Sequence, residues 1–97
     1  MAFKVIVSPQ AWDEFFQIYE YIGAESRDAA ARFCDALLNH IELPATFPHI
    51  GVARTPSRGV RSVLHTPVRT YYRVDEARQC VEVIHFRHTA RRDPRDK

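Results

Sequence analysis

The pattern of apolar and polar residues divides the chain into a strand, two helices and a run of three strands. Alternation over Phe3–Val7 predicts a first strand of about six residues. Ser8-Pro9 follows and is typical of a helix start. The serine oxygen can accept from the free amides of the first turn, and proline fits the first helical position.

Helical periodicity then continues to Pro44 in two blocks. The apolar face of the first helix, which we expect to end at Gly23, is formed by Trp12, Phe15, Phe16, Tyr19 and Ile22. The second helix is capped by Ser26, and its apolar stripe is Ala30, Cys34, Leu37, Leu38 and Ile41. The short connection between the helices predicts an antiparallel helical hairpin. The aromatic residues of the first helix are expected in the core, and the alternative is that part of this face docks a partner helix.

The second half of the chain predicts a loop and an antiparallel sheet. Residues 44–59 contain three Pro and two Gly and are expected to form a loop, with Phe47 and Ile50 tucked under the sheet. Short turns then separate three strands, which predicts a meander: Val60–Leu64, Val68–Asp75 and Cys80–Phe86. The fold class is therefore α+β, in the order β-α-α-β-β-β.

Alternation along the central strand separates two faces of this sheet. Val68, Thr70, Tyr72 and Val74 point one way, and Arg69, Tyr71 and Arg73 point the other, where Arg61 from the neighbouring strand is expected to join them. One interpretation is an ordinary solvated face. The other is a binding face for an anionic partner, because Arg and Tyr suit phosphate contacts and base stacking.

Charge separates the two halves of the chain. The 97 residues predict one domain, and their net charge is +2. Residues 1–48 carry three basic and seven acidic side chains, whereas residues 49–97 carry eleven basic and five acidic ones. The basic half is therefore a candidate surface for nucleic acid, an acidic peptide or an acidic protein groove.

The composition also limits the class of protein. Cys34 and Cys80 lack the spacing of metal ligands, so we expect reduced packing residues, no metal and no cofactor. His49 is interpreted as a surface loop residue. No signal peptide is expected, and no apolar run approaches the roughly 20 residues of a membrane span. These features predict a cytoplasmic protein that does not enter membranes.

The order of these elements and motifs resembles the RelE/ParE superfamily of bacterial type II toxins, and its ParE branch in particular. The resemblance covers residues 3 to 94 and is carried by Ser8-Pro9, the Trp12/Phe15/Tyr19 helix, Phe47-Pro48-His49-Ile50-Gly51, Arg61, Tyr71-Tyr72-Arg73-Val74, and Arg87-His88 with Ala90-Arg91-Arg92-Asp93-Pro94. It implies two helices packed on one face of a twisted antiparallel sheet. It also implies a cognate antitoxin that wraps the toxin in a hetero-oligomer with an acidic or amphipathic C-terminal segment. Trp12, Phe16, Tyr19 and Tyr71 are the candidate antitoxin-binding residues.

The resemblance does not decide between two cellular targets, DNA gyrase and the ribosome, so we compare the residues that each would require. ParE-like members poison DNA gyrase without catalytic residues, whereas RelE-like members cut mRNA on the ribosome and need an acid/base group. Here no Tyr follows Tyr72, and no Lys lies between Lys4 and Lys97, which favours gyrase. The candidate target-binding residues are Arg58, Arg61, Arg69, Arg73, Arg87, His88, Arg91 and Arg92.

Two alternatives stay open. In a ribosome-dependent mRNA endonuclease, His85 or His88 would transfer protons, while Arg61, Arg73 and Arg87 would hold the phosphate. His85 and His88 would lie on opposite faces if the strand continues through both. The third interpretation is a relative that binds its antitoxin but has no toxicity.

Overall fold

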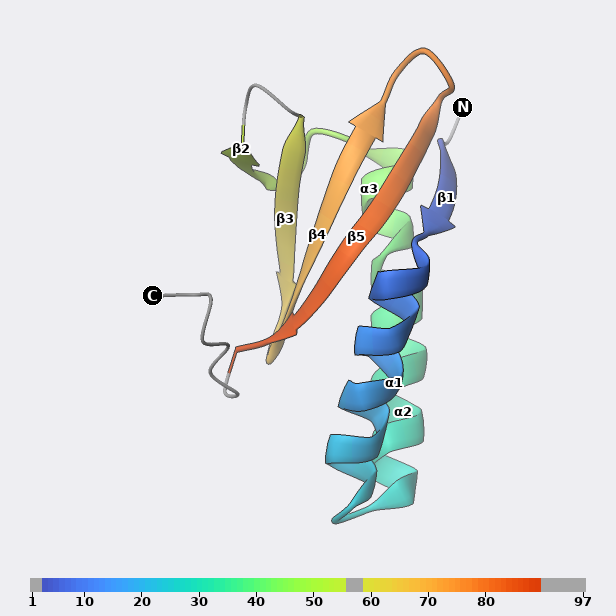
Figure 1. The fold of residues 1–97 in the computed structure, drawn as a ribbon, viewed down its shortest axis with the longest axis vertical. Coiled ribbons are helices and arrows are strands. Elements are labelled where there is room, and N and C mark those ends of the chain that lie inside the picture. The colour runs from blue at the N-terminus through green and yellow to red at the C-terminus, as the bar shows by residue number, and fades with distance from the viewer. Residues whose placement is uncertain (1–2, 56–58, 90–97) are drawn as a thin grey trace.

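The computed structural model describes residues 3–55 and 59–89 and has two layers, with helices covering one face of a single sheet (Figure 1). Its elements are β1 (Lys4–Val7), α1 (Pro9–Gly23), α2 (Arg27–His40), α3 (Glu42–Thr46), β2 (Val52–Thr55), β3 (Val60–His65), β4 (Val68–Asp75) and β5 (Cys80–His88). The predicted α+β class and the helical hairpin are confirmed. Among these residues, no helix is long and apolar enough to cross a membrane.

Both long helices begin at the predicted serines. The Ser8 hydroxyl oxygen accepts from the Ala11 N–H at 3.1 Å, and the Ser26 hydroxyl oxygen accepts from the Ala29 N–H at 3.1 Å. Each bond satisfies one of the amides that a helix leaves without an internal partner. The sequence therefore sets where α1 leaves the sheet and where α2 turns back along it.

The sheet has the strand order β1-β5-β4-β3-β2. Strands β3, β4 and β5 form the predicted antiparallel meander. Strand β1 joins β5 in parallel, with Lys4 opposite Cys80 and Val7 opposite Val83. The hairpin of α1 and α2 forms part of the connection that returns the chain to the far side of the sheet.

The predicted loop over residues 44–59 is wrong in two places, because it contains part of α3 and the whole of β2. Pro44 does not prevent α3, because it lies in the first helical turn, where backbone amides have no partner within the helix. Strand β2 is four residues long and lies at the edge of the sheet beside β3. The alternation of apolar and polar residues in β2 is too short to indicate a strand within a segment that contains three prolines.

The core contains only part of the predicted face of α1, namely Phe15 and the partly buried Ile22. Ala11, Phe15 and Ile18 are buried, whereas the expectation that the other aromatics lie in the core is wrong. The exposed fractions are 36% for Trp12, 58% for Phe16 and 39% for Tyr19. Apolar residues cover more than half of the circumference of α1. Periodicity alone could not show which part meets the sheet.

The two cysteines are buried and free, as predicted. Cys34 packs within the main core cluster, where burial and, to a smaller extent, the nearby Asp35 carboxylate raise the pKa of its thiol. A thiol of this kind stays protonated and acts as a packing group.

Phe47 and Ile50 do not tuck under the sheet, since their exposed fractions are 58% and 49%. The buried anchor of this loop is Tyr72, whose hydroxyl accepts from the Gly51 N–H at 3.0 Å and donates to the Pro48 carbonyl at 2.8 Å. Burial raises the pKa of the Tyr72 phenol, so the hydroxyl keeps the proton that it donates. A Cβ on Gly51 would lie 2.7 Å from this hydroxyl oxygen, which explains the glycine.

Replacing Tyr72 by Phe should lower the free energy of unfolding by about 1–3 kcal/mol, because a buried amide and a partly buried carbonyl lose their partner. Urea denaturation followed by circular dichroism measures this change. Tyr19→Phe is the control, because Tyr19 lies on the exposed side of α1. Equal stability of the Tyr72→Phe variant and the unchanged protein would contradict the assigned role of the hydroxyl.

Candidate functional site

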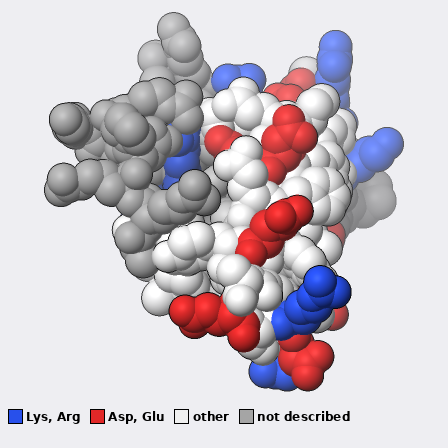
Figure 2. Space-filling model, turned by 60° about the horizontal axis from the view of Figure 1, so that its bottom comes forward, with Lys and Arg blue, Asp and Glu red and all other residues white. Residues whose placement is uncertain are grey.

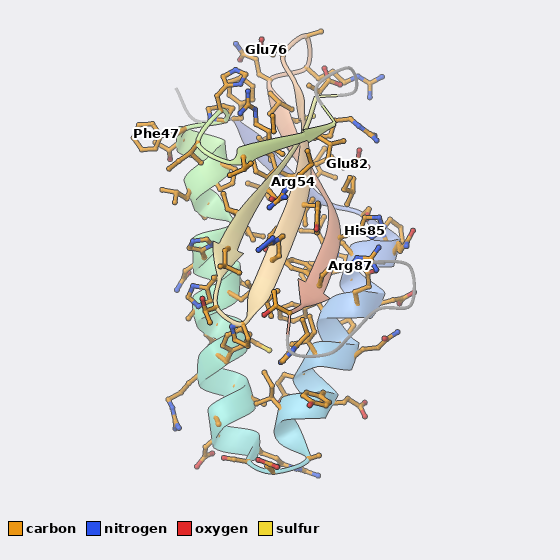
Figure 3. All side chains as sticks on the ribbon, turned by 90° about the vertical axis from the view of Figure 1, so that its left-hand side faces the viewer. Phe47, Arg54, Glu76, Glu82, His85 and Arg87 are labelled. Carbon is orange, nitrogen blue, oxygen red and sulfur yellow. The ribbon has the colours of Figure 1, made fainter. Side chains whose placement is uncertain are left out.

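The side of the sheet that faces away from the helices is formed by residues of β4 and β5, and we call it the outer face. Three directly opposed pairs form it: Arg69 with Arg87, Tyr71 with His85, and Arg73 with Glu82. Figure 3 shows Arg54, Glu82, His85 and Arg87 on this side. The buried Val68, Thr70 and Tyr72 point to the opposite side, as alternation predicted.

An irregularity in β5 determines which of its residues reach the outer face. Tyr71 is opposite His85 and Tyr72 is opposite Val83, so Ile84 is an extra residue that forms a β-bulge. Because of the bulge, Val83 and Phe86 are both buried although they are three residues apart. His85 is thereby directed outward beside Tyr71, and their rings meet edge to face at 6.3 Å.

Arg69 and Arg87 place two positive charges directly opposite each other. Like charges directly opposite each other on neighbouring strands repel. Within the residues that the structure describes, Arg69 forms no ion pair, and both side chains are partly exposed. A phosphate or carboxylate that lies between two guanidinium groups forms strong charge-assisted hydrogen bonds with both. This pair is therefore an anion-binding candidate.

Two more arginines extend the positive charge of the outer face. Arg73 lies 3.6 Å from Glu82 in an exposed ion pair, which contributes about 0–1 kcal/mol to stability and leaves Arg73 able to change partner. Arg54 of β2 donates from Nε to the Ser62 hydroxyl at 2.8 Å. The sequence predicts a loop at Arg54, within residues 44–59, and does not indicate that β2 carries this side chain to the outer face.

His85 is held by a carboxylate that the sequence did not point to. Its Nδ1 lies 3.2 Å and 3.3 Å from the two Glu14 carboxylate oxygens, and the Phe86 N–H donates to Oε1 at 3.0 Å. The exposed fractions of the side chains are 27% for His85 and 16% for Glu14. A carboxylate at Nδ1 favours the tautomer with the proton on that atom. Nε2 is then left as a proton acceptor.

The candidate residues predicted from sequence do not all gather on the outer face. Arg69, Arg73, Arg87, His85 and Tyr71 do. Arg58, Arg91 and Arg92 lie outside the described residues.

Arg61 does not join the outer face, which corrects the sequence expectation. It is opposite the buried Tyr72, and its Nη1 donates to the carbonyls of Gly51 at 2.8 Å and His49 at 3.3 Å. Consecutive residues of a strand point to opposite faces of the sheet, so Ser62, which follows Arg61, is the residue that points outward. Arg61 therefore holds the loop that Tyr72 anchors.

His88 points to the helical side of the sheet. It is opposite the buried Val68, and its ring lies 5.1 Å from the ring of Tyr21. The prediction that His85 and His88 lie on opposite faces is confirmed, because β5 continues through both. Within the described residues, no group of three His, Cys, Asp or Glu could hold a metal ion.

The four candidate docking residues fall on two surfaces. Trp12 and Phe16 stack at 6.0 Å on the exposed side of α1, where Tyr19 is also half-exposed. Tyr71 belongs to the outer face. A partner that touched all four would have to wrap around the molecule.

The chain is similar to known toxins. The model of a family described as ParE toxin of type II toxin-antitoxin system, parDE, matches residues 5–93. Among solved structures, the chromosomal ParDE toxin-antitoxin system from P. aeruginosa aligns with a TM-score of 0.73 at 15% identity, covering 90% of this chain and 96% of that one. The toxin-antitoxin complex RelBE2 from Mycobacterium tuberculosis aligns with a TM-score of 0.61 at 18% identity, covering 91% of this chain and 99% of that one.

A YoeB/ParE toxin from Agrobacterium tumefaciens aligns with a TM-score of 0.59 at 23% identity, covering 88% of this chain and 96% of that one. At these identities the likeness to solved structures establishes the fold. No curated protein sequence matches the chain closely enough to count as a relative.

Replacing Glu14 by Ala should speed hydrogen exchange of the Phe86 amide, because that amide loses its acceptor at the edge of β5. The free energy of unfolding should fall by about 1–3 kcal/mol. Glu14→Gln keeps a carbonyl oxygen and should retain most of the protection. Amide exchange followed by NMR measures both, and unchanged Phe86 exchange in Glu14→Ala would contradict the bond.

Proposed function

We propose that this chain, which belongs to the ParE toxin family of type II toxin-antitoxin systems, stops bacterial growth by binding DNA gyrase. As a toxin of that family it has a cognate antitoxin, which holds it inactive in a hetero-oligomer in the cytoplasm. The chain needs no cofactor for this role, since inhibition by binding requires only a complementary surface.

The observation that supports target binding is the opposed pair Arg69 and Arg87 on the outer face. Arg73 and Arg54 extend it into one cationic surface, with the ring of Tyr71 among them. Arginine suits this role, because its planar fork matches the phosphates of gyrase-bound DNA and the carboxylates of a protein surface. Arg91 and Arg92, which follow β5 in sequence, are proposed to add to the same contact.

The proposed antitoxin site is the exposed aromatic surface of α1, formed by Trp12, Phe16 and Tyr19. Exposed aromatics close together in space are typical of binding surfaces rather than of a solvated helix. The same segment of antitoxin is proposed to continue to Tyr71 on the outer face. A segment that covers both surfaces would prevent the cationic face from reaching its target.

Replacing both Arg69 and Arg87 by Ala should weaken inhibition of gyrase supercoiling at least about tenfold, because buried arginines at interfaces often contribute more than about 1.4 kcal/mol. Purified chain is added to gyrase, ATP and relaxed plasmid, and supercoiled product is measured. Arg32→Ala/Arg78→Ala is the matched control, because it removes two exposed arginines that are not on the outer face. Wild-type chain that leaves supercoiling untouched would overturn the gyrase target.

A second candidate function is cleavage of mRNA on the ribosome, and the Glu14–His85 pair is the observation that favours it. A histidine oriented by a carboxylate, beside two arginines and a tyrosine, has the parts needed to take a proton from a ribose hydroxyl and hold the phosphate. His88 and Arg61 would take no part, because they face the other side of the sheet.

The two functions predict different effects of His85→Ala. If the chain cuts mRNA, cleavage in a reconstituted translation reaction should fall by about 10²–10⁴-fold. If it binds gyrase, toxicity in cells at equal expression should persist. His88→Ala should leave cleavage unchanged in either case. A chain that neither cuts mRNA nor inhibits gyrase, yet still binds its antitoxin, would be the non-toxic relative.

A further inference from the structure

The charges on α1 point to the chemistry of the segment that covers its aromatic surface. The helix contains three acidic side chains and no Lys or Arg. Asp13 and Glu20 are exposed and lie seven residues apart, which is about two turns or about 10 Å along the axis. Phe16 lies between them, three residues after Asp13 and four before Glu20. The two carboxylates therefore follow the aromatic residues along one side of the helix.

Glu14, the third acid, is already occupied on the other flank of α1, where it binds His85 and the Phe86 amide. Asp13 and Glu20 form no ion pair within the described residues. Figure 2, in which the lower end of the helical hairpin comes forward, shows acidic side chains across the middle of the view and Lys and Arg mainly toward its edges. The aromatic surface therefore has an acidic border, in contrast to the arginines of the outer face.

We propose that α1 docks an amphipathic helix whose apolar residues cover Trp12, Phe16 and Tyr19 and whose flank carries Lys or Arg about two turns apart. This rests on the proposed function, because the helix is part of the antitoxin. Apolar contacts on the rings supply affinity, and the basic flank pairs with Asp13 and Glu20. The antitoxin segment accordingly changes charge along its length: it is basic on α1 and acidic where it reaches the outer face.

The charge of a helix also decides which of the two surfaces it can bind. An acidic helix placed on α1 would set its carboxylates beside Asp13 and Glu20 with no cation of α1 to separate them. The same acidic helix would be attracted to Arg69, Arg73 and Arg87 instead. The antitoxin segment can therefore bind in only one placement, with its basic part on α1 and its acidic part on the outer face. The reversed placement would bring like charges together.

Trp12 gives a direct assay, because it is the only tryptophan in the chain and lies in the proposed surface. The probes are two Trp-free peptides with leucine at the a and d positions of a heptad repeat and either lysine or glutamate at e and g. The lysine peptide should shift Trp12 emission to shorter wavelength and bind at least about fivefold more tightly than the glutamate peptide. This preference should shrink when salt is raised.

Charge reversal provides the matched control. Glu20→Lys should remove or invert the preference between the two peptides, whereas Glu76→Lys, which makes the same charge change in the β4–β5 turn, should leave it intact. Equal binding of the two peptides, or tighter binding of the glutamate peptide, would overturn the proposal. A Trp12 shift on concentrating the chain alone would assign the surface to a second copy and would also overturn it.

Failure of this inference is distinguishable from failure of the proposed function. Growth arrest and gyrase inhibition by the free chain test the toxin role without any peptide. If these hold and the lysine peptide shows no preference, only the basic docking helix is rejected. If growth arrest and gyrase inhibition fail while Trp12 still reports a preference for the lysine peptide over the glutamate peptide, the proposed chemistry of the docking surface stands and only the toxic role is rejected.

Discussion

The packing of β5 against α1 is the contact on which the candidate site depends. Phe86 is buried with its ring 5.7 Å from that of Phe15, and Val83 is buried in the same cluster. Because the bulge at Ile84 lets both β5 residues face the helix, His85 is directed to the other side of the sheet. The same close approach brings the Glu14 carboxylate to the edge of β5, where it binds an amide and a ring nitrogen. Core packing and surface chemistry are therefore consequences of one helix–strand contact.

Sequence reasoning succeeded where the signal is local. The serine caps, the meander and the two faces of β4 depend on residues a few positions apart, and all three were predictable. The buried side of α1 was not predictable, because apolar residues surround most of that helix and only the sheet decides between them. Arg61 was expected on the wrong face because the sequence does not give the register between β3 and β4, which places it opposite the inward-facing Tyr72. Glu14 could not be found at all, since its partner lies 71 residues away.

The fold places the acidic and the basic halves of the chain in different layers. The acidic half builds the helical layer, and the basic half builds most of the sheet, so among the described residues Arg54, Arg69, Arg73 and Arg87 gather on the outer face, away from the helices. Such a distribution orients an approaching charged partner before contact, in a way that a net charge of +2 would not suggest. It also separates the aromatic surface of α1 from the outer face, which are the two surfaces that the antitoxin segment is proposed to cover.

The parallel pairing of β1 with β5 places the first and last described strands side by side. On a ribosome, the helical hairpin is therefore synthesised well before the strand that completes the sheet. Local helices form quickly, whereas pairing between distant segments is slow. The aromatic surface of α1 would be presented on the nascent chain while the arginines of β5 are still being translated. A toxin built in this order is open to capture during its own synthesis, before the surface proposed for its target is complete.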